Sequence, residues 1–493
     1  MQQMETALLA LLRDALLEAK PADPGLDPEQ WQALLRLAER HKLLPLILDA
    51  AWSLPSCRIA LHPVGALIER PPSPVSAGPV IDRPSSPVQS LPLEGKVPPK
   101  GADEVVSRSA AVPSERSKHA GPPHPSSGFR ETPESTFPSR GRQGEPSATP
   151  DWQVKAIQQA TDQALRENDF LNLILGLQAR GLDPIVMKGA ICRALYPKPL
   201  LRPSLDDDLL IPAGSAPVYH AALLELGMTP YEPDGDLNRS TELCYYKKDS
   251  SLFVELNVCF FDPDSEVLRP FNEALAGAAD RAVPVRIQDV TLKTLAPTDH
   301  LLFLILHAFK HFLYGGFGLR VVADVCLYAR QYEEEIDFAR VRQRCEENRC
   351  DRFTAAVLRI GEKHLGLPAP KAFALPDVDE AALLADVLDA GLHGEDIDRI
   401  HSANYTLGAV ESRNGGRSAG GLRRALFPER KSLTPRYPWL KKRPWLLPAA
   451  WVCRAGSYLK NRGKYGNENP AASMRLGRER VELLRAYGVI DRK

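Results

Sequence analysis

The sequence lacks the markers of several protein classes. Its eight cysteines contain no Cys-x-x-Cys pair, so we expect buried thiols in a reducing compartment rather than a zinc site. No apolar stretch reaches the length of a membrane span. The apolar run near the N-terminus has no basic segment before it and is interrupted by Arg13-Asp14, which argues against a signal peptide. We therefore predict a cytoplasmic protein without a transmembrane segment.

An excess of charge of one sign is lacking too. The chain has 62 basic and 62 acidic residues, so no global field favours nucleic acid or membrane. Its apolar content of 44% and charged content of 25% are ordinary for a soluble globular protein. At 493 residues it is long enough for more than one domain. Composition and patterning divide it into five segments: 1–54, 55–151, 152–295, 296–410 and 411–493.

The first two segments differ sharply in composition. In 1–54, leucines at helical spacing predict helices, and Asp27-Pro28-Glu29-Gln30 predicts a helix start with an N-cap acid and a capping-box glutamine. Residues 55–150 hold 19 of the chain's 44 prolines. Such a segment cannot bury enough apolar surface to offset its ordering entropy, so we predict a disordered insertion or linker over 55–151. A plain spacer is favoured over a docking segment for a partner.

Segment 152–295 is predicted to form an α/β core. Apolar residues at helical spacing over 154–180 predict a long helix, and shorter apolar and amphipathic runs follow it. Residues 296–410 are expected to be mainly helical. The predicted fold class is α+β, a small mixed-sheet core with N-terminal helices and a mainly helical C-terminal region. The expected core elements are strands at 184–187, 208–211, 243–247 and 252–258 and helices at 189–195 and 215–226.

The last segment, 411–493, is predicted to be a helical tail that is basic and aromatic. Between residues 413 and 464, fourteen Lys or Arg residues stand against one acid, Glu429, and tryptophans and tyrosines lie among them. The apolar run 446–452 is too short to span a bilayer. Two readings remain open: a helical face with snorkelling side chains, or contact with a polyanion or an anionic membrane surface.

Three acidic residues begin an apolar strand in the core segment, Asp206-Asp207-Asp208-Leu209-Leu210-Ile211. Successive side chains of a strand face opposite sides, so Asp206 and Asp208 share a face and Asp207 faces away. Glu255, on a nearby strand, adds a third carboxylate. Three converging carboxylates repel one another unless a cation offsets their charge. We therefore predict that Asp206, Asp208 and Glu255 are catalytic residues and ligands of Mg²⁺.

A second motif, Lys188-Gly189, lies upstream between a short apolar strand and a helix. Glycine lets the backbone approach a ligand, and the free N–H groups of a helix start attract phosphate. Arg202 suits bidentate contact with phosphate. We predict that Lys188, Gly189 and Arg202 bind phosphate, as part of the cofactor or substrate; for Lys188, a solvated turn residue is the alternative.

Together these motifs resemble a known family. The order of apolar strand, Lys188-Gly189, Tyr196-Pro197, Arg202-Pro203 and Asp206-x-Asp208 is similar to that of the uncharacterised nucleotidyltransferase family of the polymerase-β-like superfamily. Further matches to that family are Glu255 in its acidic strand, and His307, His311, Arg320 and Asp324 in its His-x-x-x-His helix and the Arg and Asp that follow.

Two positions depart from the family pattern. Asp207 stands where the family has an apolar residue, and Asn257 replaces its common histidine. A carboxylate that faces the core is expensive unless it is paired, so Asp207 is expected either to have a partner or to lie at the strand mouth.

Two further pairs have open roles. His307 and His311 have metal-ligand spacing on one helix face, but packing or hydrogen bonding is favoured because no third ligand completes a motif. Arg320 and Asp324, also four residues apart, fit an ordinary pair on a helix surface.

The resemblance implies an enzyme that transfers a nucleoside monophosphate from a nucleoside triphosphate (NTP) to an acceptor hydroxyl, with Mg²⁺ and release of pyrophosphate. Under it, Asp206 and Asp208 hold the metal that bridges the phosphates, and Glu255 completes a second metal site and helps to deprotonate the acceptor. The acceptor is a small molecule or a protein. The alternative is a catalytically degenerate nucleotide-binding or adaptor protein that recruits partners through the Pro-rich segment and the basic tail.

Overall fold

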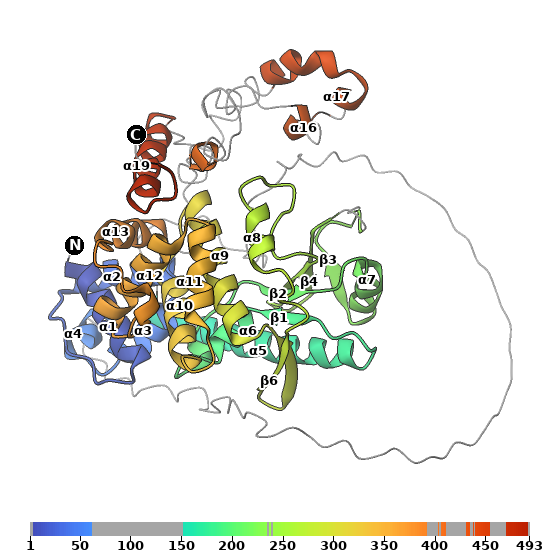
Figure 1. The fold of residues 1–493 in the computed structure, drawn as a ribbon. Coiled ribbons are helices and arrows are strands. Elements are labelled where there is room, and N and C mark those ends of the chain that lie inside the picture. The colour runs from blue at the N-terminus through green and yellow to red at the C-terminus, as the bar shows by residue number, and fades with distance from the viewer. Residues whose placement is uncertain are drawn as a thin grey trace, which may run out of the picture.

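The described part of the chain combines helices with a mixed sheet of seven strands (Figure 1). A computed structural model describes residues 3–61, 151–391 apart from 234, 235, 238 and 239, and the pieces 403, 406–410, 430–433, 437, 439–453 and 470–491. The predicted α+β class, with helical regions on both sides of the core, is confirmed. Most of the predicted linker, residues 62–150, lies outside the described residues.

The N-terminal part is helical as predicted, with α1 (Gln3–Leu16), α2 (Pro28–Arg40), α3 (Leu44–Ala51) and α4 (Pro55–Leu61). The capping box predicted for α2 is confirmed. The Asp27 side chain accepts a hydrogen bond from the Gln30 N–H at 2.8 Å, and the Gln30 side chain accepts one from the Asp27 N–H at 3.0 Å. These bonds satisfy two backbone donors that a helix start leaves unpaired.

Helix α4 corrects the boundary predicted at residue 55. Pro55 opens a helix rather than a linker, and Cys57 and Ala60 are buried in the main core. The Ser56 N–H donates to the Asp23 carboxylate at 3.0 Å, which anchors the helix start. Proline fits the first turn of a helix because that turn needs no hydrogen bond from its N–H. The prediction was wrong here because Pro55 was grouped with the prolines that follow it.

The strand order of the sheet is β3-β4-β5-β2-β1-β7-β6. Strand β2, at the centre, runs antiparallel to β1 and parallel to β5. The hairpin of β6 and β7 and the short β3 are additions to the predicted strands. The strands are β1 (Ile185–Met187), β2 (Asp207–Leu210), β3 (Met228–Pro230), β4 (Glu242–Lys247), β5 (Phe253–Asn257), β6 (Val283–Ile287) and β7 (Val290–Thr294).

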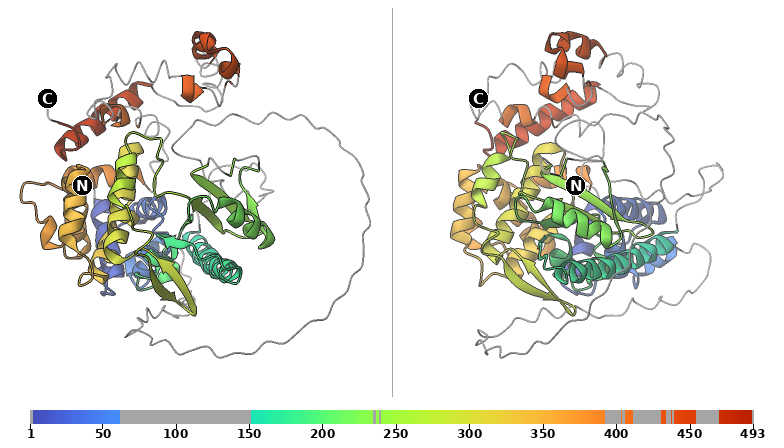
Figure 2. Two further views of the ribbon diagram at one scale, coloured as in Figure 1. Left: turned by 45° about the vertical axis from the view of Figure 1, so that its right-hand side comes forward. Right: turned by 90° about the vertical axis from the view of Figure 1, so that its right-hand side faces the viewer.

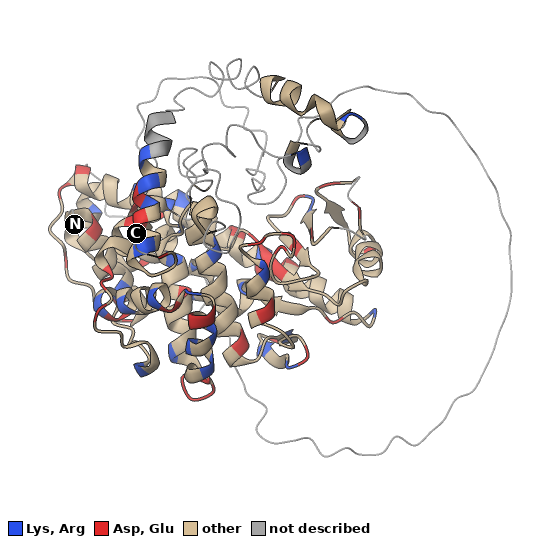
Figure 3. Ribbon diagram, turned by 45° about the horizontal axis from the view of Figure 1, so that its top comes forward, with Lys and Arg blue, Asp and Glu red and all other residues tan. Residues whose placement is uncertain are grey.

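Helices cover the sheet and form a body beside it. The long helix α5 (Trp152–Gln178) runs along the sheet (Figures 1 and 2). The remaining helices of the core and of the helical region are α6 (Gly189–Arg193), α7 (Ala216–Glu225), α8 (Arg269–Ala274), α9 (Pro297–Tyr314), α10 (Leu319–Gln331), α11 (Phe338–Glu347), α12 (Asp351–Leu365) and α13 (Ala381–Ala390). Lys, Arg, Asp and Glu are interspersed along these helices (Figure 3).

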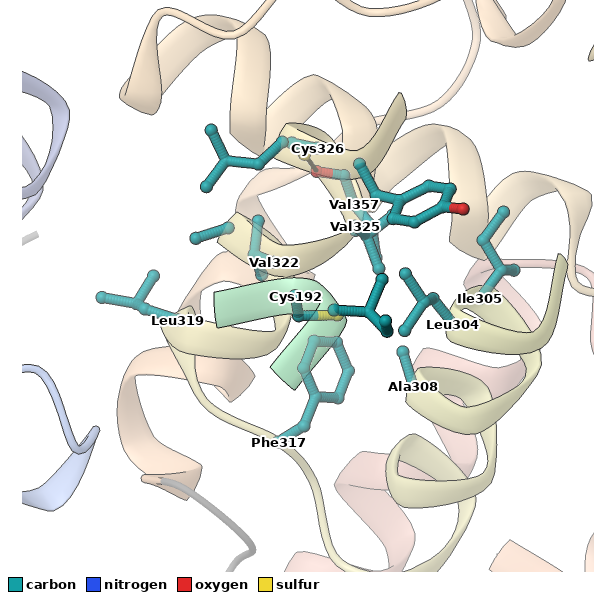
Figure 4. Close-up of a cluster of buried hydrophobic side chains, with 14 of the residues drawn as sticks. Cys192, Leu304, Ile305, Ala308, Phe317, Leu319, Val322, Val325, Cys326 and Val357 are labelled. Atoms are coloured by element: carbon teal, nitrogen blue, oxygen red, sulfur yellow. Dashed lines mark hydrogen bonds between the residues drawn. The ribbon is translucent and has the colours of Figure 1, made fainter. Parts of the chain in front are cut away.

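The short helix α6 is buried along its whole length. Figure 4 shows Cys192 of α6 among apolar side chains of α9 and α10, including Leu304, Ala308 and Val322. Apolar contact on this scale fixes the orientation of a helix of only five residues, which would not be stable alone. The packing therefore holds in place the turn between β1 and α6.

The two ends of the chain meet in the helical body. The α1–α4 helices lie beside α12 and α13 (Figure 1), and Arg40 donates to the Leu388 carbonyl at 2.6 Å. Helix α19 (Pro470–Ala486) docks there through Arg480, whose guanidinium contacts both Asp386 carboxylate oxygens at 2.7 and 2.8 Å.

Two predictions, on the burial of the cysteines and on membrane-spanning segments, can be compared with the described residues. Six of the eight cysteines are buried, whereas Cys259 is half-buried and Cys453 is exposed. Across the described ranges, no single helix combines the length and hydropathy needed to cross a membrane; α3 and α4 reach that threshold only as a pair, and their axes bend by 119°.

We expect the Arg480→Met substitution to lower the free energy of unfolding by about 3–5 kcal/mol, because it leaves the Asp386 carboxylate buried without its partner. Chemical denaturation measures this loss. Arg475→Met on the same helix is the matched control, since the Arg475 side chain is 78% exposed and its pair with Glu479 is a surface pair. Equal stability of the Arg480 and Arg475 variants would contradict the docking of α19 described here.

Candidate metal and nucleotide site

The three predicted carboxylates come together on the two neighbouring interior strands β2 and β5, near the start of β2. Strands β2 and β5 pair in parallel with Asp208 opposite Glu255, and Asp206 directly precedes β2. One carboxylate oxygen from each residue lies within 4.8 Å of those of the other two. Alternation along β2 puts Asp206 and Asp208 on the face that Glu255 shares. This spacing suits oxygen ligands around one divalent cation.

The Lys188 ammonium lies among these carboxylates. Its Nζ is 2.8 Å from Asp208 Oδ2, 3.8 Å from Asp206 Oδ2 and 3.0 Å from His307 Nε2. Three carboxylates and one ammonium leave two negative formal charges in a largely buried space. A divalent cation would neutralise that charge.

The pKa values of these groups show the same imbalance. Burial raises the pKa of Glu255 well above its usual range, and repulsion from Asp208 and Asp206 adds to this effect. Burial also raises the pKa of Asp208, to about 6, although the Lys188 ammonium opposes the shift. For Lys188, burial lowers the pKa, but attraction to the three carboxylates outweighs burial and raises it. The site is therefore short of positive charge.

The backbone of Lys188 has an unusual conformation, with φ of +46°. The left-handed region is unfavourable for a residue with a side chain, so it persists only where neighbours hold it. His300 on α9 is one such neighbour: its Nε2 accepts from the Lys188 N–H at 3.4 Å, and its Nδ1 lies 3.3 Å from Thr294 Oγ1. Thr294 in turn donates to the Val186 carbonyl at 2.7 Å. These contacts tie the turn to β7 and α9.

Gly189 follows in that turn with φ of +31°. A Cβ atom at this position would lie 2.3 Å from Asp207 Oδ1, so no other residue fits without displacing the carboxylate. The structure thus explains Gly189 by its close approach to β2 and by its backbone conformation.

Asp207, the departure from the family pattern, has a buried partner. It faces away from the three grouped carboxylates and pairs with Arg166 of α5, with Nε and Nη2 at 3.0 and 2.8 Å from Asp207 Oδ2. Neither side chain is more than 3% exposed. The expectation that a core-facing carboxylate needs a partner is confirmed.

Arg166 does more than neutralise Asp207. Its guanidinium also donates to the carbonyls of Leu205, Ser251 and Phe253, at 2.6, 3.1 and 3.0 Å. Leu205 precedes Asp206, and Phe253 is two residues before Glu255. One side chain therefore joins the starts of β2 and β5, the two strands that present the carboxylates.

Arg202, predicted as a phosphate ligand, lies in a second buried ion pair. Its Nε and Nη2 contact the Asp324 carboxylate at 2.8 and 2.6 Å, and its Nη1 donates to Ser204 Oγ at 2.8 Å. The Tyr196 hydroxyl donates to Asp324 Oδ1, the oxygen that Arg202 Nε contacts, at 2.9 Å. The predicted surface pairing of Asp324 with Arg320 is wrong: Arg320 donates to the Pro203 carbonyl, and both side chains are buried.

The histidines of α9 form a short polar row beside Lys188. His307 Nε2 lies 3.0 Å from Lys188 Nζ and 3.3 Å from His311 Nε2. This arrangement agrees with the favoured reading of the pair as hydrogen-bonding histidines.

Sequence reasoning missed several members of the site. Glu242 and Cys244 on β4 lie beside Glu255, and the ligand atoms of these three residues are also within 4.8 Å of one another. Alternation in β4 would have placed Glu242 and Cys244 on one face. For Arg166 and His300 no local signal exists, because each acts on residues far away in the sequence.

A mixed sheet that presents three grouped carboxylates beside a Lys-Gly turn is the arrangement expected of a nucleotidyltransferase. The comparison with protein families agrees: residues 141–366 match the family described as uncharacterised nucleotidyltransferase. The matched region contains every predicted site residue. The resemblance drawn from the motifs is confirmed, and nucleotidyl transfer is supported as the general activity. No curated protein and no solved structure matches the chain.

We expect Arg166→Met to lower the free energy of unfolding by about 3–5 kcal/mol, since it leaves Asp207 charged, buried and unpaired. Adding Asp207→Leu removes that charge and should restore part of the loss. Chemical denaturation of the two single variants and the double variant gives the coupling energy. Losses that simply add would show that the two side chains do not act as a pair.

A further prediction concerns His300, whose burial lowers its pKa to about 3, from the usual 6.5. Between these values the unfolded chain binds one proton more than the folded protein, so stability falls as pH decreases below about 6.5. His300→Gln keeps an acceptor for the Lys188 N–H but cannot bind that proton. As pH decreases, the free energy of unfolding of this variant should fall less steeply than that of the wild type, and the two slopes should differ by about 1.4 kcal/mol per pH unit. Parallel pH profiles of wild type and variant would contradict a buried neutral His300.

Proposed function

We propose that the protein transfers a nucleoside monophosphate from an NTP to an acceptor hydroxyl, with Mg²⁺ as cofactor and pyrophosphate as the second product. The observation that carries this proposal is the grouping of Asp206, Asp208 and Glu255 around the Lys188 ammonium. That grouping lies within the region that matches the nucleotidyltransferase family.

The residues present fit a hard divalent cation. All three offer oxygen ligands, and the excess of negative charge in a buried space is what a cation would offset. Asp206, Asp208 and Glu255 would hold the metal. Bound there, Mg²⁺ would neutralise charge on the phosphates and make the acceptor hydroxyl easier to deprotonate.

The other roles follow from the chain's own groups. The acceptor oxygen attacks the α-phosphorus, the bond from that phosphorus to the pyrophosphate oxygen breaks, and the Glu255 carboxylate accepts the hydroxyl proton. Lys188 and the Gly189 N–H would neutralise and orient the triphosphate.

For Arg202 we propose an indirect role in place of phosphate contact. All three of its guanidinium nitrogens already have partners, so it would position the segment before Asp206 through its pair with Asp324. Arg202 thereby becomes a positioning residue for the metal ligands.

The catalytically degenerate alternative is not favoured. A protein that had lost its chemistry would have no need to keep three mutually repelling carboxylates and their counter-ion together. Neither departure from the family pattern removes one of the three: Asp207 has a structural partner, and Asn257 lies beyond Glu255 on β5.

The test is transfer of label from each α-labelled NTP to a component of cell extract, with and without Mg²⁺. We expect labelled product only with the metal, and a loss of at least about a hundredfold in Asp206→Asn, Asp208→Asn and Glu255→Gln, which remove carboxylate ligands but keep side-chain shape. Asp264→Asn, in the exposed loop after β5, is the matched control and should retain full activity. Transfer that survives a chelator, or survives in all three variants, would overturn the proposal.

A further inference from the structure

The basic tail contains one short helix that is apolar on more than one side. Its described part spans Pro444–Cys453 and has the sequence Pro-Trp-Leu-Leu-Pro-Ala-Ala-Trp-Val-Cys, without a charged residue. At about 1.5 Å per residue it is about 15 Å long, roughly half of the hydrocarbon thickness of a bilayer. Arg443 and Arg454 bound this uncharged stretch, which is too short to span a membrane and long enough to lie on one.

One side of this helix is already covered. Ala450 is fully buried, and Leu447 and Trp451 pack with it in a small apolar cluster that also contains Leu433 and Leu440. This cluster shares no residue with the main core. Packing in the small cluster therefore determines which side of the helix is exposed to solvent.

The other side is an exposed apolar stripe. Trp445 is 70% exposed and Val452 is 72% exposed, and Pro448 and Ala449 between them are exposed as well. Positions 445, 448, 449 and 452 follow the spacing of a single helix face. Packing in the small cluster accounts for the apolar residues on the first side of the helix, but it leaves those of the stripe exposed.

Basic residues flank the stripe in the sequence. Lys441, Lys442 and Arg443 come directly before the helix and Arg454 directly after it, and no acid occurs between 430 and 466. The chain as a whole has no net charge, so this concentration of positive charge is local. An apolar face with cations at its ends matches the boundary between acyl chains and anionic headgroups.

We propose that helix 444–453 docks on an anionic lipid bilayer, with Trp445, Pro448, Ala449 and Val452 facing the acyl chains, while the positive charge of the flanking sequence strengthens attraction to the headgroups. A nucleic acid is the less suitable partner. Binding to a single strand uses several stacking rings and polar groups, whereas three of the four exposed residues are aliphatic or proline. This proposal is independent of the catalytic assignment.

The experiment measures co-sedimentation of the 493-residue chain with two kinds of vesicle. One kind is made of phosphatidylcholine alone, and in the other about a third of the lipid is the anionic phosphatidylserine. We expect binding to the anionic vesicles, weakening in high salt, and little binding to the neutral ones. The variant Trp445→Asp/Val452→Asp should bind anionic vesicles at least about tenfold more weakly. Val154→Asp is the matched control, since Val154 is 61% exposed on α5, away from this helix; it should bind as wild type.

Cys453 provides a second readout, because it is the exposed one among the eight cysteines. An environment-sensitive dye on Cys453 should report an apolar surrounding when anionic vesicles are added. Unchanged vesicle binding in the double aspartate variant would overturn the proposal, and so would absence of binding to either vesicle. Binding of single-stranded RNA that displaces the protein from vesicles and survives in the double variant would assign the basic segment to nucleic acid instead.

Discussion

The buried pair of Arg166 and Asp207 is the interaction on which the site depends. Asp207 is flanked in sequence by two carboxylates that face the other side of the sheet, so its own charge must be met from α5. Arg166 meets it and also bonds carbonyls at the starts of β2 and β5. Because breaking such a pair leaves an uncompensated charge in the core, the two strands are held in one register. That register brings Asp208 opposite Glu255.

The opposite face of the same strands carries a different balance. There, three carboxylates meet one ammonium, and burial raises the pKa values of Asp208 and Glu255. On the Asp207 face of β2 the buried charges are therefore paired and the side chains are held in place, whereas the face with Asp206 and Asp208 carries an excess of negative charge. A rigid scaffold with an unbalanced face is suited to binding a cation and a triphosphate, because the strands that carry the carboxylates need not rearrange to receive them. Gly189 lies between the two faces, close enough to Asp207 that no side chain fits.

Local pattern in the sequence was enough to predict the α+β class and the shared face of Asp206, Asp208 and Glu255. Alternation along a strand is a local property, and β2 and β5 obey it. Local sequence pattern could not predict the partners of these residues. Arg166 lies 41 residues before Asp207, and His300 lies 112 residues after Lys188, so their contacts depend on the packing of α5 and α9. Arg202 was assigned to phosphate for its chemistry alone, whereas a buried Asp324 on α10 engages it in the folded chain.

The central claim is that Asp206, Asp208 and Glu255 together hold a divalent cation against an NTP. The most direct measurement is a crystal structure with Mn²⁺ and a non-hydrolysable NTP, in which anomalous scattering locates the metal. The account predicts an anomalous peak in contact with oxygens of all three carboxylates and of the triphosphate, with Lys188 turned to the phosphates. An NTP bound elsewhere, or a triphosphate bound here with no metal at the carboxylates, would contradict it.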